Sequence, residues 1–410
     1  MLTPLGYFFA ILGTMLSVYT AYWGLLLVAG GITIRKDRKT WKNSAARPRV
    51  SIIIPAKNEE KVIGRLLASL QTINYDKDKV EIIVSESGST DHTVDVVMDF
   101  CKQDKRIRLV RSGAVGKGNA LNEAIKYATG ELFFFTDADC VPENDFLVKA
   151  AAMYAANVHS MVGYPKTINS AQNILTKLAI FEDLIWRIMS VGRDRLGLSV
   201  PLAGPYCVIS RKALCSVGFE FRDVLTEDIE LWARLLKNGY VTRYIDAFVW
   251  QEAPSRLTTL IRQRIRWYRG YMETGLHHID IFKRTDLAKA TDALLMLSTP
   301  FFAMLSIFSY FISWFSLPDL ASSLGIVLFV AVFFGANILG FIALNAGLVY
   351  FAGKDALGLL KISPFVYLYF IVLGISSSLA ILHLITRRHA IYNRTEKTGY
   401  SDMSFLQQKR

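Results

Sequence analysis

The chain has 410 residues, of which 52% are hydrophobic, and a formal net charge of +12. That hydrophobic share is too high for an ordinary soluble protein and indicates membrane-spanning segments. The positive charge does not call for nucleic acid, because the basic residues gather beside the apolar segments, where anionic lipid headgroups attract them. We therefore expect membrane lipids, and no nucleic acid, among the partners. The four cysteines form no CxxC pair and no zinc spacing.

The chain begins with an apolar segment, residues 1–34, that contains no Lys, Arg, Asp or Glu. It exceeds the ~20 residues that a helix needs to cross a bilayer. No basic region precedes it, which argues against a signal peptide. A basic juxtamembrane linker, residues 35–48, follows at once. By the positive-inside rule the N-terminus lies outside and the next domain is cytoplasmic, in a multi-pass protein of the cell membrane.

Residues 49–255 have globular composition and open with alternating strand and helix patterns. Alternation of this kind predicts the α/β class, with a doubly wound, mostly parallel sheet. Such sheets bind ligands at the carboxyl ends of their strands. The expected strands are 50–56, 80–85, 107–111 and 132–136, and the expected helices are 60–71, 91–102 and 119–127.

A first acidic cluster, Asp137-Ala138-Asp139, ends the fourth expected strand. Residues i and i+2 of an extended chain point the same way, and two adjacent carboxylates repel each other. A divalent cation removes that conflict, and carboxylate oxygens suit Mg²⁺ or Mn²⁺, which usually bind together with substrate phosphates. The alternative is a solvated turn that happens to carry two acids.

A second acidic cluster, Thr226-Glu227-Asp228, precedes a run with helical spacing. Acids at a helix N-terminus can simply complement the helix dipole. The functional interpretation is a general base, because a sugar hydroxyl is a poor nucleophile until a carboxylate takes its proton.

Residues 256–290 are expected to form interfacial amphipathic helices. They contain the sequence Gln263-Arg264-Ile265-Arg266-Trp267, which has the pattern QxxRW. One interpretation is a helix whose arginines reach the membrane surface. In the other, Arg266 binds a leaving diphosphate bidentately and Trp267 offers its flat face to a sugar ring.

Three apolar transmembrane segments are expected within residues 291–386, at about 291–315, 322–350 and 361–386, followed by a basic polar tail, 387–410. Three full crossings would place the basic tail outside, which the positive-inside rule disfavours. One of the three segments is therefore expected to lie in the interface or to re-enter.

Taken together and in this order, the motifs resemble those of the membrane-bound family 2 glycosyltransferases, which include cellulose, chitin and hyaluronan synthases. The resemblance covers about residues 48–275. Its elements are Pro55-Ala56-Lys57-Asn58-Glu59, Gly88-Ser89-Thr90-Asp91, Gly116 to Asn122, Asp137-Ala138-Asp139, Gly218-Phe219, Thr226-Glu227-Asp228 and Gln263 to Trp267.

The resemblance implies a GT-A-like, doubly wound mixed sheet that binds a nucleotide-sugar donor, a UDP-sugar before others. The implied donor-binding residues are Pro55, Asn58, Glu59, Glu86, Lys117, Asp137, Gln263 and Arg266. Asp139, with Asp137, would hold the Mg²⁺ or Mn²⁺, Asp228 would be the catalytic base, and Glu227 and Trp267 would contact the acceptor. Glu86-Ser87 stands where many relatives carry Asp-Asp, so the contact with the base of the nucleotide must differ.

The resemblance also implies a metal-dependent, inverting hexosyltransferase, and two kinds of acceptor compete. The first is a growing polysaccharide, which the QxxRW pattern and the Thr226-Glu227-Asp228 cluster favour. The second is a lipid, such as a polyprenyl-linked sugar or a ceramide-like molecule. A membrane scaffold with a degenerate transferase fold is disfavoured, because the acidic and QxxRW motifs are complete.

Overall fold

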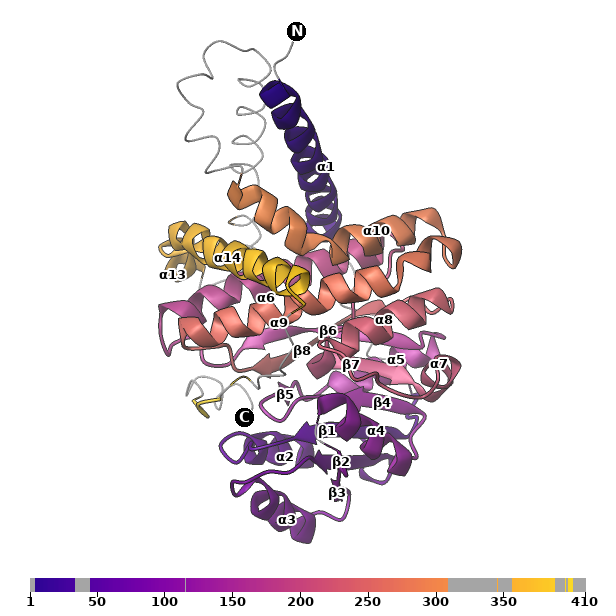
Figure 1. Ribbon diagram of the computed structural model, residues 1–410. Coiled ribbons are helices and arrows are strands. Elements are labelled where there is room, and N and C mark those ends of the chain that lie inside the picture. The colour runs from indigo at the N-terminus through magenta and orange to yellow at the C-terminus, as the bar shows by residue number, and fades with distance from the viewer. Residues whose placement is uncertain are drawn as a thin grey trace.

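The computed structural model describes residues 4–33, 45–114, 116–308, 345, 356–387, 395 and 397–400. A long apolar helix, α1 (Pro4–Thr33), projects from a layer of helices, and that layer covers one side of an α/β domain (Figure 1). Each of the four predicted strands and three predicted helices overlaps the corresponding element, with ends that differ by at most three residues.

The sheet has eight strands in the order β3-β2-β1-β4-β7-β6-β8-β5. Its first four strands pair in parallel, whereas β7 runs antiparallel to both β4 and β6. The sheet is therefore mixed, as the GT-A resemblance implied. The strands are β1 (Val50–Ala56), β2 (Val80–Glu86), β3 (Ile107–Arg111), β4 (Leu132–Phe135), β5 (Val141–Pro142), β6 (Ser160–Thr167), β7 (Cys207–Ser210) and β8 (Arg243–Gln251).

The strand order fixes where a ligand can bind. From β1 the chain moves outward through β2 and β3, and then returns to place β4 on the other side of β1. The order thus reverses between β1 and β4, and a crevice forms at the carboxyl ends of strands at such a reversal. Both of these strands are apolar and buried, including Ile52 to Ile54 and Phe133 to Phe135, so the polar residues that follow them are held on a rigid base.

Helices of the α/β domain bury one apolar face each. In α2 (Ile63–Gln71) the side chains of Ile63, Leu66, Leu67 and Leu70 are fully buried, at the helical spacing seen in the sequence. The remaining helices of this domain are α3 (Thr93–Gln103), α4 (Lys117–Tyr127), α5 (Phe146–Ala155), α7 (Arg211–Ser216) and α8 (Glu227–Lys237).

A second layer contains α6 (Ile174–Arg195), α9 (Leu257–His277), α10 (Leu287–Leu297) and α14 (Val366–Ile385) (Figure 1). The apolar helix α1 packs closely on α6, because glycines lie at the crossing. A Cβ on Gly30 would lie 2.2 Å from the carbonyl oxygen of Ile188, and one on Gly192 would lie 2.2 Å from that of Leu26. Small residues at such contacts let two helix backbones approach.

By length and composition, two helices among the described residues could cross a membrane, at Ile11–Gly31 and Ser363–Ile385. A third candidate is the pair Leu287–Leu297 and Thr299–Phe308, which is bent by 52°. The expected apolar segment at 322–350 lies outside the described residues except for Asn345. Helix α14 lies along α9 and across the direction of α1 (Figure 1).

Candidate active site

The loops after β1 and β2 are clamped together by the Pro55 to Glu59 motif. Asn58 has a left-handed backbone (φ 54), and its side-chain oxygen accepts the N–H of Thr90 at 2.7 Å. The Asn58 N–H in turn donates to the Ser89 hydroxyl at 2.9 Å, and the Glu59 N–H donates to the Thr93 hydroxyl at 2.6 Å. Asn58 therefore holds the loops after β1 and β2 together.

Glu86 ends β2 and is buried. Its carboxylate accepts the backbone N–H of Ser89, so it closes the turn of its own loop. This contact gives Glu86 a local role in shaping the loop after β2.

The Asp137-Ala138-Asp139 motif forms a turn, so the prediction that it is extended was wrong. Strand β4 already ends at Phe135, and the N–H of Cys140 donates to the carbonyl oxygen of Asp137 at 3.0 Å. The two carboxylates consequently meet different partners. Asp137 contacts Lys117, whereas the buried Asp139 contacts Lys397.

Lys117 joins the two acidic clusters. It begins α4, and its Nζ lies 2.9 Å from Oδ1 of Asp137 and 3.0 Å from Oε1 of Glu227. Gly204 lies beside it, where an added Cβ would be 3.0 Å from this Nζ. The lysine thus balances a carboxylate from each cluster at the carboxyl end of the sheet.

Asp228 stands apart from these ion pairs. It is half-buried near the start of α8, and its carboxylate accepts the N–H of Gly204 at 2.8 Å and that of Ile229 at 2.9 Å. Burial raises the pKa of Asp228 to about 6, and the adjacent Glu227 carboxylate acts in the same direction, whereas Lys117 opposes it. A carboxyl with such a pKa can accept a proton near neutral pH.

The two acidic clusters share one pocket. Asp137, Glu227 and Asp228 all line it. The lining residues are Pro55, Lys117, Leu121, Phe135, Thr136, Asp137, Leu202, Gly204, Cys207, Phe221, Glu227, Asp228 and Leu231.

The QxxRW motif lies on α9 and borders the second acidic cluster. Arg266 donates from Nη1 to the carbonyl oxygen of Leu225 at 3.3 Å, just before that cluster. One turn further on, Gly270 packs against Thr226, and a Cβ there would lie 2.4 Å from the Thr226 hydroxyl. The absence of a side chain at Gly270 thus brings Arg266 close to the cluster.

The neighbours of Arg266 in the motif have other contacts. Arg264 pairs with Glu182 of α6, and its guanidinium lies 4.2 Å from the centre of the Trp267 ring. One face of Trp267 is therefore covered by Arg264. Gln263 donates to the Thr395 hydroxyl at 3.4 Å.

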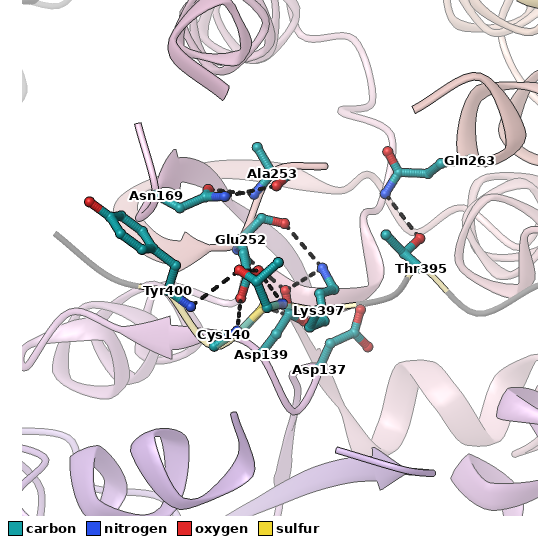
Figure 2. A network of polar contacts seen from close by, with 12 residues as sticks. Asp137, Asp139, Cys140, Asn169, Glu252, Ala253, Gln263, Thr395, Lys397 and Tyr400 are labelled. Carbon is teal, nitrogen blue, oxygen red and sulfur yellow. Dashed lines mark hydrogen bonds and ion pairs between the residues drawn. The ribbon is translucent and has the colours of Figure 1, made fainter. Parts of the chain in front are cut away.

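Sequence patterns did not indicate four further residues at this site: Gly204, Glu252, Gly270 and Lys397. The two glycines leave room for the side chains of Lys117 and Thr226 to approach closely. No local sequence pattern shows this. Glu252 and Lys397 are brought to Asp139 only by the tertiary fold (Figure 2).

The described residues contain no group of three or more His, Cys, Asp or Glu side chains placed to hold a metal ion. Asp137 and Asp139 nevertheless each hold a lysine ammonium, so both carboxylates lie where positive charge is favoured. Mg²⁺ and Mn²⁺ commonly use only one or two protein carboxylates and take substrate phosphates as further ligands. The oxygen donors present thus fit a metal that binds together with a diphosphate.

Residues 51–217 match the family described as Glycosyl transferase family 2. This part of the chain, called the family 2 domain below after that match, is similar to family 2 glycosyltransferases. It contains the loops of the nucleoside pocket, Lys117 and the Asp137 to Asp139 turn, whereas Asp228 and the QxxRW helix lie beyond residue 217.

The curated relatives of this chain include a protein named as a probable glycosyltransferase and two named as synthases of a glycolipid and a polysaccharide. The chain is 30% identical over 259 residues to the probable glycosyltransferase YdaM of Bacillus subtilis, covering 60% of this chain and 62% of that one. It is 26% identical to the beta-monoglucosyldiacylglycerol synthase of a Nostoc species, covering 75% and 68% of the two chains. It is 29% identical to the poly-beta-1,6-N-acetyl-D-glucosamine synthase of Staphylococcus epidermidis, covering 55% of each. The chain thus spans between about half and two thirds of these relatives' lengths.

The fold of the family 2 domain and its helical layer also occurs in a solved structure. A mannosyltransferase from Pyrobaculum calidifontis, described in complex with GDP-Man and Mn²⁺, matches with a TM-score of 0.60 and 20% identity. The match covers 93% of this chain and all of that one. The GT-A-like fold predicted from the motifs is therefore confirmed.

Proposed function

We propose that this protein transfers a sugar from a nucleoside-diphosphate donor to an acceptor at the membrane surface, in a metal-dependent, inverting reaction. The observation that carries this proposal is the arrangement around Lys117. One ammonium connects Asp137 to Glu227, and the Asp228 carboxyl, with a pKa near 6, lines the same pocket. A cation site and a poised base are the two features that such a transfer requires.

The residues divide the reaction between them. Asp228 accepts the proton of the acceptor hydroxyl as that oxygen attacks the anomeric carbon of the donor. A divalent metal held by Asp139 and the donor phosphates would supply charge stabilisation to the leaving diphosphate. Arg266 and Lys117 would add positive charge beside the same group. A single displacement inverts the configuration and needs no covalent sugar–enzyme intermediate.

For the donor we propose a UDP-sugar. The clamped loops after β1 and β2, with Pro55 at the pocket wall, would hold the nucleoside. Glu86 would contribute by shaping the loop, because its carboxylate is engaged by Ser89.

For the acceptor we propose a growing polysaccharide, as in the relative named poly-beta-1,6-N-acetyl-D-glucosamine synthase. A lipid acceptor is the second candidate, and a specific observation favours it. The relative named beta-monoglucosyldiacylglycerol synthase aligns over 75% of this chain, compared with 55% for the polysaccharide synthase.

We further propose that the family 2 domain faces the cytoplasm and that the N-terminus lies outside. The basic linker at 35–48 directly after the first apolar helix supports this orientation.

A labelled-donor screen of the full chain in detergent tests the function. We expect one nucleotide-sugar to yield product, EDTA to abolish the reaction, and added Mn²⁺ or Mg²⁺ to restore it. A polymer ladder would identify a polysaccharide synthase, and a single product soluble in organic solvent would identify a lipid transferase. Full activity in excess chelator would contradict the metal dependence, and no transfer from any donor, with lipid and glycan acceptors supplied, would contradict the function.

A further inference from the structure

Part of the basic tail lies against the catalytic end of the sheet. The tail segment, which here means Thr395 together with residues 397–400, crosses beside Asp139 and Glu252 (Figure 2). Lys397 places its Nζ 2.5 Å from Oδ2 of Asp139 and donates to the carbonyl oxygen of Glu252 at 3.1 Å. The Lys397 ammonium therefore contacts the same carboxylate oxygen that the proposed metal would bind.

Glu252 anchors the rest of this segment. It directly follows β8 and is buried, and its Oε1 accepts both the N–H and the hydroxyl of Thr398 at 2.6 Å. Its Oε2 accepts the N–H of Gly399 at 3.2 Å. The Glu252 carboxylate therefore accepts three hydrogen bonds from the tail segment. A buried carboxylate needs such partners, so this contact is a specific binding site for the tail segment and not a chance surface contact.

The backbone conformation and close packing of the tail segment fit this binding site at Glu252. Gly399 has a left-handed backbone (φ 77), and a Cβ there would lie 3.0 Å from the carbonyl oxygen of Lys61. The Lys397 and Asp139 side chains are only 13% and 8% exposed, so little water screens their ion pair. The tail segment thus contacts Asp139 and Glu252 and lies close to Lys61.

An ammonium and a metal ion cannot share Oδ2 of Asp139. At a separation of about 3 Å two positive charges repel strongly, and the repulsion grows where burial lowers the effective dielectric constant. We propose, building on the metal-dependent transfer proposed above, that the tail segment is an autoinhibitory strap: Lys397 holds the cation position on Asp139, and a divalent metal bound with a diphosphate must displace it. Glu252 holds the strap in its closed position, and release of Lys397 loosens that hold.

Metal binding tests this exclusion without relying on turnover. Free Mn²⁺ would be followed by electron paramagnetic resonance during titration of the full chain in detergent, with inorganic pyrophosphate present. If about one molecule in ten has an open strap, the apparent affinity of the native chain is reduced about tenfold, so Lys397→Met should bind Mn²⁺ about tenfold more tightly. Lys126→Met, which removes an exposed lysine of α4, should bind as the native chain does, and Asp139→Asn should lose the site.

The possible outcomes distinguish a failure of the autoinhibitory strap from a failure of the proposed metal-dependent transfer. Equal or weaker Mn²⁺ binding by Lys397→Met, with clear binding by the native chain, would overturn the strap and leave metal-dependent transfer standing. No Mn²⁺ binding by any variant would overturn both.

Hydrogen exchange provides a second measurement on the unmodified chain, and it does not depend on a variant that folds. Adding Mn²⁺ and pyrophosphate should speed exchange at the Thr398 and Gly399 amides, which donate to Glu252. Glu252→Gln should speed the same amides without metal. Protection that stays unchanged or increases when Mn²⁺ and pyrophosphate are added to the native chain would overturn the strap.

Discussion

Asp228 and Glu227 are neighbours in sequence with opposite electrostatic surroundings. Glu227 lies 3.0 Å from the Lys117 ammonium, whereas the contacts described for Asp228 are backbone N–H donors. Burial of Asp228 disfavours its charged form and raises the pKa of that carboxyl. This difference between adjacent acids supports Asp228 as the base and gives Glu227 a role in holding Lys117.

The pH dependence of transfer follows from this assignment. Since burial and Glu227 raise the pKa of Asp228 to about 6, the carboxyl is protonated below that pH and cannot accept the acceptor proton. We expect kcat/KM to rise with pH through an apparent pKa near 6 and then level off. Steady-state rates between pH 4.5 and 8.5 would check this, and a profile that is already level at pH 5 would contradict it.

Glu227→Gln provides a matched comparison at the same scale. The substitution keeps the size of the side chain and removes the charge that faces Lys117. It also removes a negative charge that raises the pKa of Asp228, so the rising limb of the pH profile should move to lower pH. Rates for the two chains measured across the same pH range would show it, and an unmoved or upward-shifted limb would argue against the coupling.

At the scale of elements, the contact between α9 and the second acidic cluster depends on one glycine. A methyl group at Gly270 would lie 2.4 Å from the Thr226 hydroxyl and would push α9 away. Overpacking of this kind costs about 1–3 kcal/mol, and the displacement would carry Arg266 away from the leaving group. Gly270→Ala should therefore lower kcat by more than the loss of folded protein alone would explain.

A control for this prediction lies on the same helix. A Cβ at Gly275 would make an ordinary contact, 3.4 Å from the side chain of Leu297, so Gly275→Ala should leave kcat near the native value. Thermal denaturation alongside kinetics would separate folding from catalysis. A Gly270→Ala chain with the native kcat would show that the position of α9 is not critical.

The first half of the fold could be predicted from sequence because its elements carry strong periodic patterns. The apolar β-branched run at 50–56 and the helical spacing of Ile63, Leu66, Leu67 and Leu70 both match the structure. The Asp137 to Asp139 turn could not be predicted, because it depends on one hydrogen bond from Cys140 that a residue pattern does not encode.

The same limit applies to the candidate site. Each motif could be found in sequence, but Lys117 between Asp137 and Glu227 is a contact between residues about 20 and 110 positions apart, fixed by the sheet order. The tail was predicted to be a basic membrane-proximal segment, and its contact with Asp139 spans 258 positions. Such contacts arise only once the whole domain has folded.

At the scale of the whole molecule, the tail contact bears on topology. Lys397 touches Asp139, so in the proposed membrane topology this part of the tail lies on the same side as the family 2 domain. Three full crossings after the domain would separate them. The placement of α14 along α9 and across the direction of α1 (Figure 1) supports α14 as the segment that lies in the interface.

Cysteine labelling tests this topology. Cys215, exposed in the catalytic domain, is a natural reference, and Tyr400 is an exposed position in the tail. A membrane-impermeant maleimide should label Cys215, and Tyr400→Cys in a Cys215→Ser chain, in inverted vesicles but not in intact cells. Labelling of the two positions from opposite sides would contradict a tail that contacts the domain.

The most direct measurement of the central claim compares Asp228→Asn with the native chain for both sugar transfer and nucleoside-diphosphate affinity. Asparagine keeps the shape of the side chain and removes its basicity, and loss of general-base catalysis typically costs ~10²–10⁴-fold in rate. We predict a rate reduced by at least about a hundredfold and a nearly unchanged nucleotide affinity, because the base contacts the acceptor. A variant that retains more than about a tenth of the native rate, or that loses nucleotide binding instead, would contradict the account.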